Sequence, residues 1–127
     1  MAGSLLLLTI EVKFAAGQTA QAVYDIRVDR STTRREDLGP LFARMRVKLS
    51  GPIDDQWRRS YNEVVGGADS FSRFVLDPKD GTVSFSSRST DDAARVELVI
   101  QRLELLLELA NLHATTAAAC QQERRSA

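Results

Sequence analysis

The chain of 127 residues has few of the side chains from which catalytic and metal sites are most often built. It contains one cysteine, Cys120, and one histidine, His113. A single cysteine excludes an internal disulfide and a cysteine cluster for zinc, and it is typical of a reducing, intracellular compartment. The Gly66-Gly67 pair lacks the lysine and the spacing of a phosphate-binding loop. We therefore expect that the chain is not an enzyme and needs no cofactor or metal.

An excess of one charge and a long apolar run are also lacking. Lysine plus arginine number 17 and aspartate plus glutamate number 17, so the net charge is zero, which argues against a dedicated polybasic binder. The four leucines at residues 5–8 are followed at once by Thr9, Glu11 and Lys13, and no basic segment precedes them. This pattern predicts neither a signal peptide nor a membrane span. The length predicts about one domain.

Hydrophobic periodicity predicts several elements. Residues 5–14 (LLLLTIEVKF) alternate between apolar and polar side chains, as a half-buried strand does. Residues 71–76 and 82–87 are two β-rich runs around the turn sequence DPKDG and predict a hairpin. Residues 53–65 predict a short helix that ends at Gly66.

Two stretches and the C-terminal end are less regular. Residues 15–29 alternate in a way that slightly favours a strand, but their alanines favour a helix. Residues 41–49 fit either a helix or a strand. We expect one domain over residues 1–113, followed by a flexible tail over residues 114–127, where apolar content is too low for packing.

Residues 88–113 predict one long helix with two apolar faces. At 100° per residue the first stripe is broad enough to cover a small sheet. A second stripe lies nearly opposite the first, and one sheet cannot bury both. We therefore predict that the second stripe contacts another chain; the alternative is that residues 38–65 fold over it. The first stripe comprises Val96, Val99, Ile100, Leu103, Leu106, Leu107 and Ala110, and the second comprises Leu98, Leu105, Leu109 and Leu112.

Basic residues gather in the middle of the chain. Nine basic and five acidic residues lie between positions 27 and 59, an excess of four. Arginines among serines and threonines suit phosphate contacts, and Trp57 could stack on a base. The alternative, which the sequence favours, is a solvated surface beside a core tryptophan. The candidates for nucleic-acid contact are Arg30, Arg34, Arg35, Arg58 and Arg59.

Four segments follow one another in an informative order. They read TIEVKF, AQAVYDIRVD (20–29), SRFVLDPKDGTVSF and STDDAARVELVIQRLELLLELA (89–110). Together they resemble the small Pcc-type subunit of the KEOPS complex, the family that includes the LAGE/CTAG proteins. The resemblance implies an α+β fold, in which two helices cover a three-stranded antiparallel sheet in the order β-α-β-β-α. Residues 18–28 would then be the first helix, and residues 31–70 a partly helical insertion.

The resemblance also implies a non-catalytic function in the cytoplasm, and it leaves an additional nuclear role open. Such a subunit docks on the ATPase-like catalytic subunit, and it pairs with itself or with another small subunit through its sheet. The complex attaches threonylcarbamoyl to the adenosine beside the tRNA anticodon, and the small subunit would engage tRNA only indirectly or weakly. The implied partner interface comprises Val23, Tyr24, Leu98, Leu105, Leu109 and Leu112. Two alternatives are a small dimeric chaperone-like carrier and a stand-alone RNA-binding module that uses residues 27–59.

Overall fold

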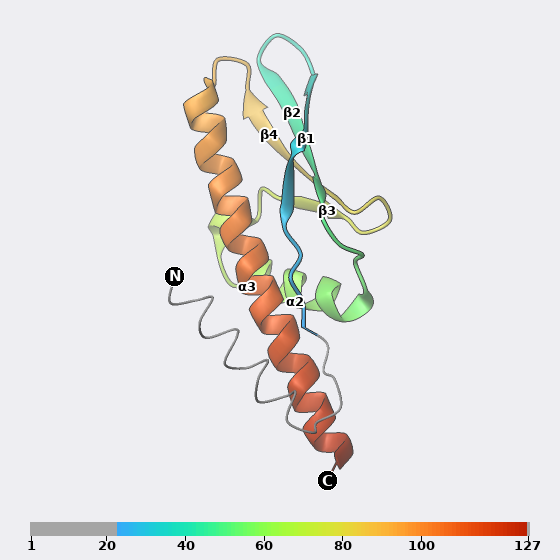
Figure 1. Ribbon diagram of the computed structural model, residues 1–127. Helices are drawn as coiled ribbons and strands as arrows, with labels where there is room; N and C mark the ends of the chain where they lie inside the picture. Colours follow the sequence, from blue (N-terminus) through green and yellow to red (C-terminus); the bar gives the residue numbers. More distant parts are fainter. Residues whose placement is uncertain (1–22, 127) are drawn as a thin grey trace.

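The computed structural model describes residues 23–126, and the side chains of residues 23–124. The strand predicted at residues 5–14 lies outside this range. Within it, two hairpins each precede a helix (Figure 1). The elements are β1 (Val28–Asp37), β2 (Phe42–Leu49), α2 (Asp55–Gly66), a 3-10 turn (Asp69–Phe71), β3 (Val75–Asp77), β4 (Thr82–Arg88) and α3 (Ala93–Ser126).

The strands form one antiparallel sheet with the order β1-β2-β4-β3. The α+β class is confirmed, but the sheet in the described part has four strands and not the three that we predicted. The element order is correspondingly β-β-α-β-β-α instead of β-α-β-β-α. Both helices lie on one side of the sheet, and α3 runs along the whole length of the molecule (Figure 1).

The core lies between the sheet and the two helices. Burial alternates strictly along β2, so Met45 and Val47 face inward and pair across the strands with Phe85 and Val83. Trp57 on α2 and Leu103 on α3 are fully buried against this layer. The first stripe of the long helix is therefore the core face that the sequence predicted. Its buried members are Ile100, Leu103, Leu106, Leu107 and Ala110, and Val96 and Val99 are partly buried.

Residues 31–70 are not an insertion beside the fold, because they contain most of β1 and all of β2 and α2. The prediction was wrong because β1 (VDRSTTRRED) carries almost no apolar side chain. It is an edge strand that pairs only with β2, and it contains an irregularity between Asp29 and Arg34. Charged side chains and bulges are common on edge strands, where they discourage pairing with other chains. Hydrophobic periodicity cannot detect such a strand.

The prediction of a first helix, which the resemblance implies, is also wrong for the residues that the structure describes. Residues 23–27 adopt no helix, and Val28 already begins β1. The segment instead lies along α3, where Tyr24 N donates a hydrogen bond to Thr115 Oγ1 at 3.1 Å. Ile26 N donates to Asn111 Oδ1 at 3.1 Å. Side chains of α3 thus satisfy backbone groups that a helix would have bonded internally.

α3 continues to Ser126, so the predicted tail over residues 114–126 is helical. Ala114 is fully buried, and Thr115 accepts the bond from Tyr24, so this segment takes part in packing that the sequence did not reveal. Its alanines also have the highest intrinsic helix propensity. At 1.5 Å per residue α3 is about 50 Å long.

Local side-chain and glycine signals set the starts of both helices and the turn between β3 and β4. Asp54 caps α2, since its Oδ1 accepts a hydrogen bond from Trp57 N at 2.8 Å. Asp92 caps α3 in the same way through Arg95 N at 2.9 Å. Gly81, with φ of 68°, supplies the left-handed residue of the turn between β3 and β4.

Candidate protein-docking surface

The second stripe of α3 is exposed along the helix. The exposed fractions are 65% for Leu98, 46% for Leu105, 38% for Leu109 and 64% for Leu112. We call these four residues the leucine face. Residues 38–65 adjoin one end of it through Val64 but leave all four leucines exposed, so the internal cover that was the alternative is not formed. The face points away from the sheet because it lies nearly opposite the buried stripe of the same helix.

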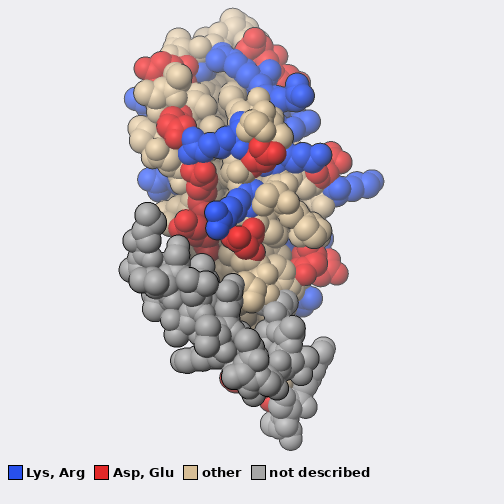
Figure 2. All heavy atoms as spheres, in the orientation of Figure 1, with Lys and Arg blue, Asp and Glu red and all other residues tan. Residues whose placement is uncertain are grey.

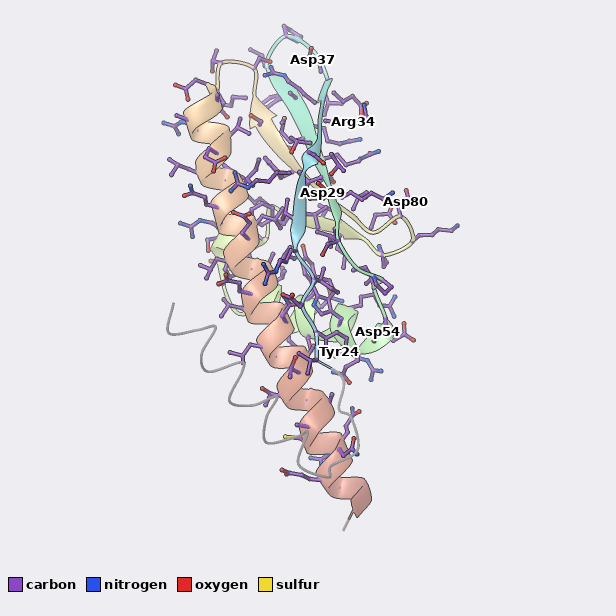
Figure 3. All side chains as sticks on the ribbon, in the orientation of Figure 1. Tyr24, Asp29, Arg34, Asp37, Asp54 and Asp80 are labelled. Atoms are coloured by element: carbon purple, nitrogen blue, oxygen red, sulfur yellow. The ribbon has the colours of Figure 1, made fainter. Side chains whose placement is uncertain are left out.

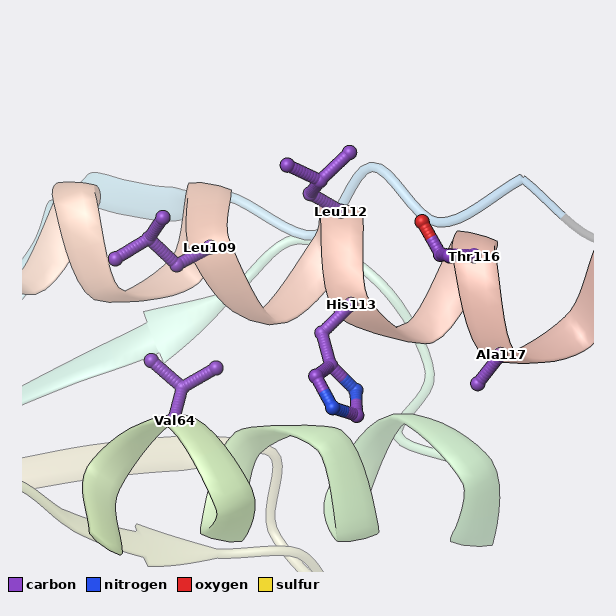
Figure 4. A pocket seen from close by; sticks show the side chains of 6 residues that line it. All are labelled: Val64, Leu109, Leu112, His113, Thr116 and Ala117. Carbon is purple, nitrogen blue, oxygen red and sulfur yellow. The ribbon is translucent and has the colours of Figure 1, made fainter. Parts of the chain in front are cut away.

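A shallow groove of about 460 Å³ adjoins the leucine face where α2 passes beside α3 (Figure 4). Leu109 and Leu112 form one side of it, and Val64 of α2 lies across from them. His113 points toward α2, where its Nδ1 lies 2.8 Å from Oγ of the buried Ser60. This histidine therefore connects two helices. The groove extends the apolar surface from α3 onto α2.

Val23 and Tyr24 do not share one role. Val23 is 48% exposed. Tyr24 is half-buried against the core, and its hydroxyl donates a hydrogen bond to Asp54 Oδ2 at 2.8 Å (Figure 3). Burial, with a smaller effect of the Asp54 carboxylate, raises the pKa of Tyr24 to about 12. Tyr24 thus joins the N-terminal end of α2 to the described start of the chain, which is a structural role.

Asn111 is the residue that sequence reasoning missed. Its amide group bonds both backbone groups of Ile26: Oδ1 accepts from Ile26 N at 3.1 Å and Nδ2 donates to Ile26 O at 2.9 Å. Oδ1 also accepts from Trp57 Nε1 at 2.8 Å. One side chain therefore joins α3, α2 and the segment before β1. The available signal was a lone asparagine beside the apolar stripe of a long helix.

Arg30 connects β1 to the acidic border of α3. Its Nη1 lies 2.6 Å from Glu97 Oε2, and its Nη2 lies 2.6 Å from Glu104 Oε1. The hydrogen bonds to Glu104 and Glu97 raise the pKa of Arg30, and the bond from Arg30 lowers the pKa of Glu97. The guanidinium of Arg30, which we had considered for nucleic-acid contact, therefore forms ion pairs with two carboxylates of the protein itself.

The other candidates for nucleic-acid contact lie on two different elements, and two of them form ion pairs. Arg35 pairs with Asp37, and Arg58 pairs with Asp55. Arg58 and Arg59 lie on α2, whereas Arg34 lies on β1. Trp57 is completely buried, which agrees with the core tryptophan that the sequence favoured and excludes stacking on a base.

The described residues contain no group of three or more His, Cys, Asp or Glu side chains that could hold a metal ion. Over the same range no helix is both long enough and apolar enough to cross a membrane. A scan against protein-family models, a search of curated proteins and a search of solved structures found no significant match to the chain. The leucine face and the adjoining groove are therefore the features on which a functional proposal rests.

Proposed function

We propose that this protein is a non-catalytic subunit that docks on another protein through the leucine face of α3. The observation that carries the proposal is the exposure of all four leucines on one side of a helix whose other side is already buried. Full burial of a leucine side chain contributes roughly 1.5 to 3 kcal/mol. Four neighbouring leucines therefore offer a partner a large gain in free energy.

The surroundings of the leucine face define the partner's chemistry. Arg95 and Arg102 are exposed along one border of the face, and Gln101 and Glu108 along the other. A straight apolar stripe with charged borders suits a second amphipathic helix that packs lengthwise against α3. The adjoining groove beside Val64 would accept a larger apolar side chain from that helix.

The resemblance suggests which protein supplies the helix. We propose the ATPase-like catalytic subunit of the KEOPS complex, whose product is threonylcarbamoyladenosine in tRNA. In the described residues the resemblance now depends on the hairpin of β3 and β4 and on α3, because residues 23–28 form no helix. The identity of the partner is thus a separate claim from the use of the leucine face, and it needs its own test.

Co-purification with the KEOPS catalytic subunit of the same organism tests both claims. We expect a complex of defined mass by light scattering, and we expect the variant Leu105→Asp/Leu109→Asp to abolish it. The matched control is Leu38→Asp/Leu41→Asp, which changes two exposed leucines of the loop between β1 and β2 and should bind normally. Equal loss of binding in both variants would contradict a role for the leucine face.

A stable homodimer that ignores the catalytic subunit would refute the KEOPS assignment. If Leu105→Asp/Leu109→Asp also made that homodimer monomeric, the leucine face would still be the docking surface. The function would then be that of a small dimeric carrier.

A further inference from the structure

The outer face of the sheet, on the side without helices, carries a cluster of cations. Directly opposed residues of an antiparallel pair point to the same face, so the strand register identifies its members. We call this cluster the basic sheet face, and all of its members are exposed. It comprises Arg34, Arg44, Arg46, Lys48 and Arg88.

Cations and hydroxyls face each other in three successive pairs across β2 and β4. Arg44 lies opposite Ser86, Arg46 opposite Ser84 and Lys48 opposite Thr82. Neighbouring strands are about 4.8 Å apart, and alternate residues of one strand are about 6.7 Å apart. A phosphate group placed above one pair can therefore accept hydrogen bonds from a charged donor and a hydroxyl together.

The cations of this face form few interactions within the described residues, apart from Arg88, whose charge helps to lower the pKa of Asp91. None of the five forms an ion pair within the described residues, whereas Arg30 and Arg35 of β1 each form one. Arg34 and Arg46 stand directly opposite each other, and like charges in this position are destabilising. An anionic ligand would remove that repulsion.

Three acidic residues on the same face, Asp29, Glu36 and Asp77, leave it with a net charge of +2, since 5 − 3 = 2. Asp29 accepts a hydrogen bond from Ser31 and forms no ion pair with Lys48. The whole chain has no net charge, and Figure 2 shows basic and acidic side chains side by side over the visible face. Figure 2 shows Lys and Arg side chains along the right-hand edge, where the sheet lies.

We propose that the basic sheet face binds single-stranded nucleic acid. The pairs of cations and hydroxyls suit the phosphates, and Phe42, which is 54% exposed and lies opposite Arg88, is placed to stack on a base. A membrane surface fits less well, because Phe42 and Val75 are the only large exposed apolar side chains at this face among residues 23–124, and the three acidic residues oppose anionic lipid.

Fluorescence anisotropy with a labelled single-stranded oligonucleotide of about 12 nucleotides tests the proposal. We expect binding at low salt that weakens as salt rises. The variant Arg44→Gln/Arg46→Gln should lower the affinity at least about tenfold and reduce the magnitude of the logarithmic salt slope by about 1.4, because each single-strand phosphate contact contributes about 0.7. Phe42→Ala should weaken binding but leave the slope unchanged, since stacking releases no counterions.

The matched control is Arg58→Gln/Arg59→Gln, which removes the same charge from two exposed arginines of α2. It should bind like the wild type. Absence of binding at low salt, or an equal loss in the control, would overturn the proposal, as would binding to anionic vesicles but not to the oligonucleotide. Leu105→Asp/Leu109→Asp should keep full oligonucleotide binding, so failure here and failure of the docking proposal can be told apart.

Discussion

The described start of the chain is held on α3 mainly by the side chain of Asn111. Replacing it in the variant Asn111→Ala leaves Ile26 N, Ile26 O and Trp57 Nε1 without their bonds. Each unsatisfied group costs about 1 to 3 kcal/mol when it stays dry. Because the site is only partly buried, we expect the free energy of unfolding to fall by about 3 kcal/mol in urea denaturation followed by Trp57 fluorescence.

The control for this prediction is Asn62→Ala, at an exposed position of α2, which should change the free energy of unfolding by less than about 0.5 kcal/mol. If Asn111→Ala were as stable as the control, Asn111 would not be the link between α3, α2 and the segment before β1.

Arg30 makes stability depend on pH through Glu97. The pKa of Glu97 is lower in the folded protein than its ordinary value of 4.5, because Arg30 stabilises the charged form. A carboxyl with a lowered folded pKa contributes stability above its unfolded pKa, and this contribution is lost as pH falls through the folded value. We expect Arg30→Gln to reduce the acid-side loss of stability, measured by urea denaturation at several pH values.

An NMR titration of the Glu97 carboxyl measures the same effect directly. Its pKa should rise toward the ordinary value in Arg30→Gln and stay low in Arg34→Gln, which removes an arginine of the same strand that forms no ion pair within the described chain. An unchanged pKa of Glu97 in Arg30→Gln would rule out the link between β1 and α3.

Among the elements, those with strong local signals could be predicted from the sequence. The hairpin of β3 and β4 is confirmed, although β3 begins at Val75 and not at residue 71, and α2 ends at Gly66 as expected. β2 follows the strand alternative for residues 41–49, since its burial alternates at every residue. In each case periodicity, caps and turn residues agree.

β1 and the end of α3 could not be predicted, because tertiary contacts determine them. β1 is polar apart from Val28, and it is a strand because β2 offers it a partner. The C-terminal part of α3 reads as a tail, and yet Ala114 is buried in the core. The burial of the first stripe and the exposure of the leucine face, by contrast, follow from helical geometry alone, whereas the docking role of the leucine face stays a prediction.

A truncation tests the role of the C-terminal turns of α3. Removing residues 114–127 should destabilise the fold, because it removes buried Ala114 and the Thr115 hydroxyl that bonds Tyr24. We expect a loss of about 2 to 4 kcal/mol in the free energy of unfolding, typical of a small cavity plus an unsatisfied backbone group. Removing only residues 122–127 should cost less than about 1 kcal/mol, because the last turn of a helix frays. Equal stability of the two truncations would show that residues 114–121 do not pack.

At the scale of the whole molecule, two surfaces lie on opposite sides of one core. The leucine face points away from the sheet, and the basic sheet face points away from the helices. A partner protein and an anionic polymer could therefore bind at the same time without touching each other's site. Net charge and composition gave no sign of this, because acidic residues spread over the rest of the chain balance the cations of the sheet.

The claim that the leucine face serves docking and not folding is tested most directly by the free energy of unfolding of Leu105→Asp/Leu109→Asp. On an exposed surface the change should remain within about 0.5 kcal/mol per residue, as it should for Leu38→Asp/Leu41→Asp. A docking surface therefore predicts two equally stable variants, of which only the first loses its partner. A loss of more than about 4 kcal/mol in the helix variant alone would mean that the leucines belong to the core, and the docking account would be wrong.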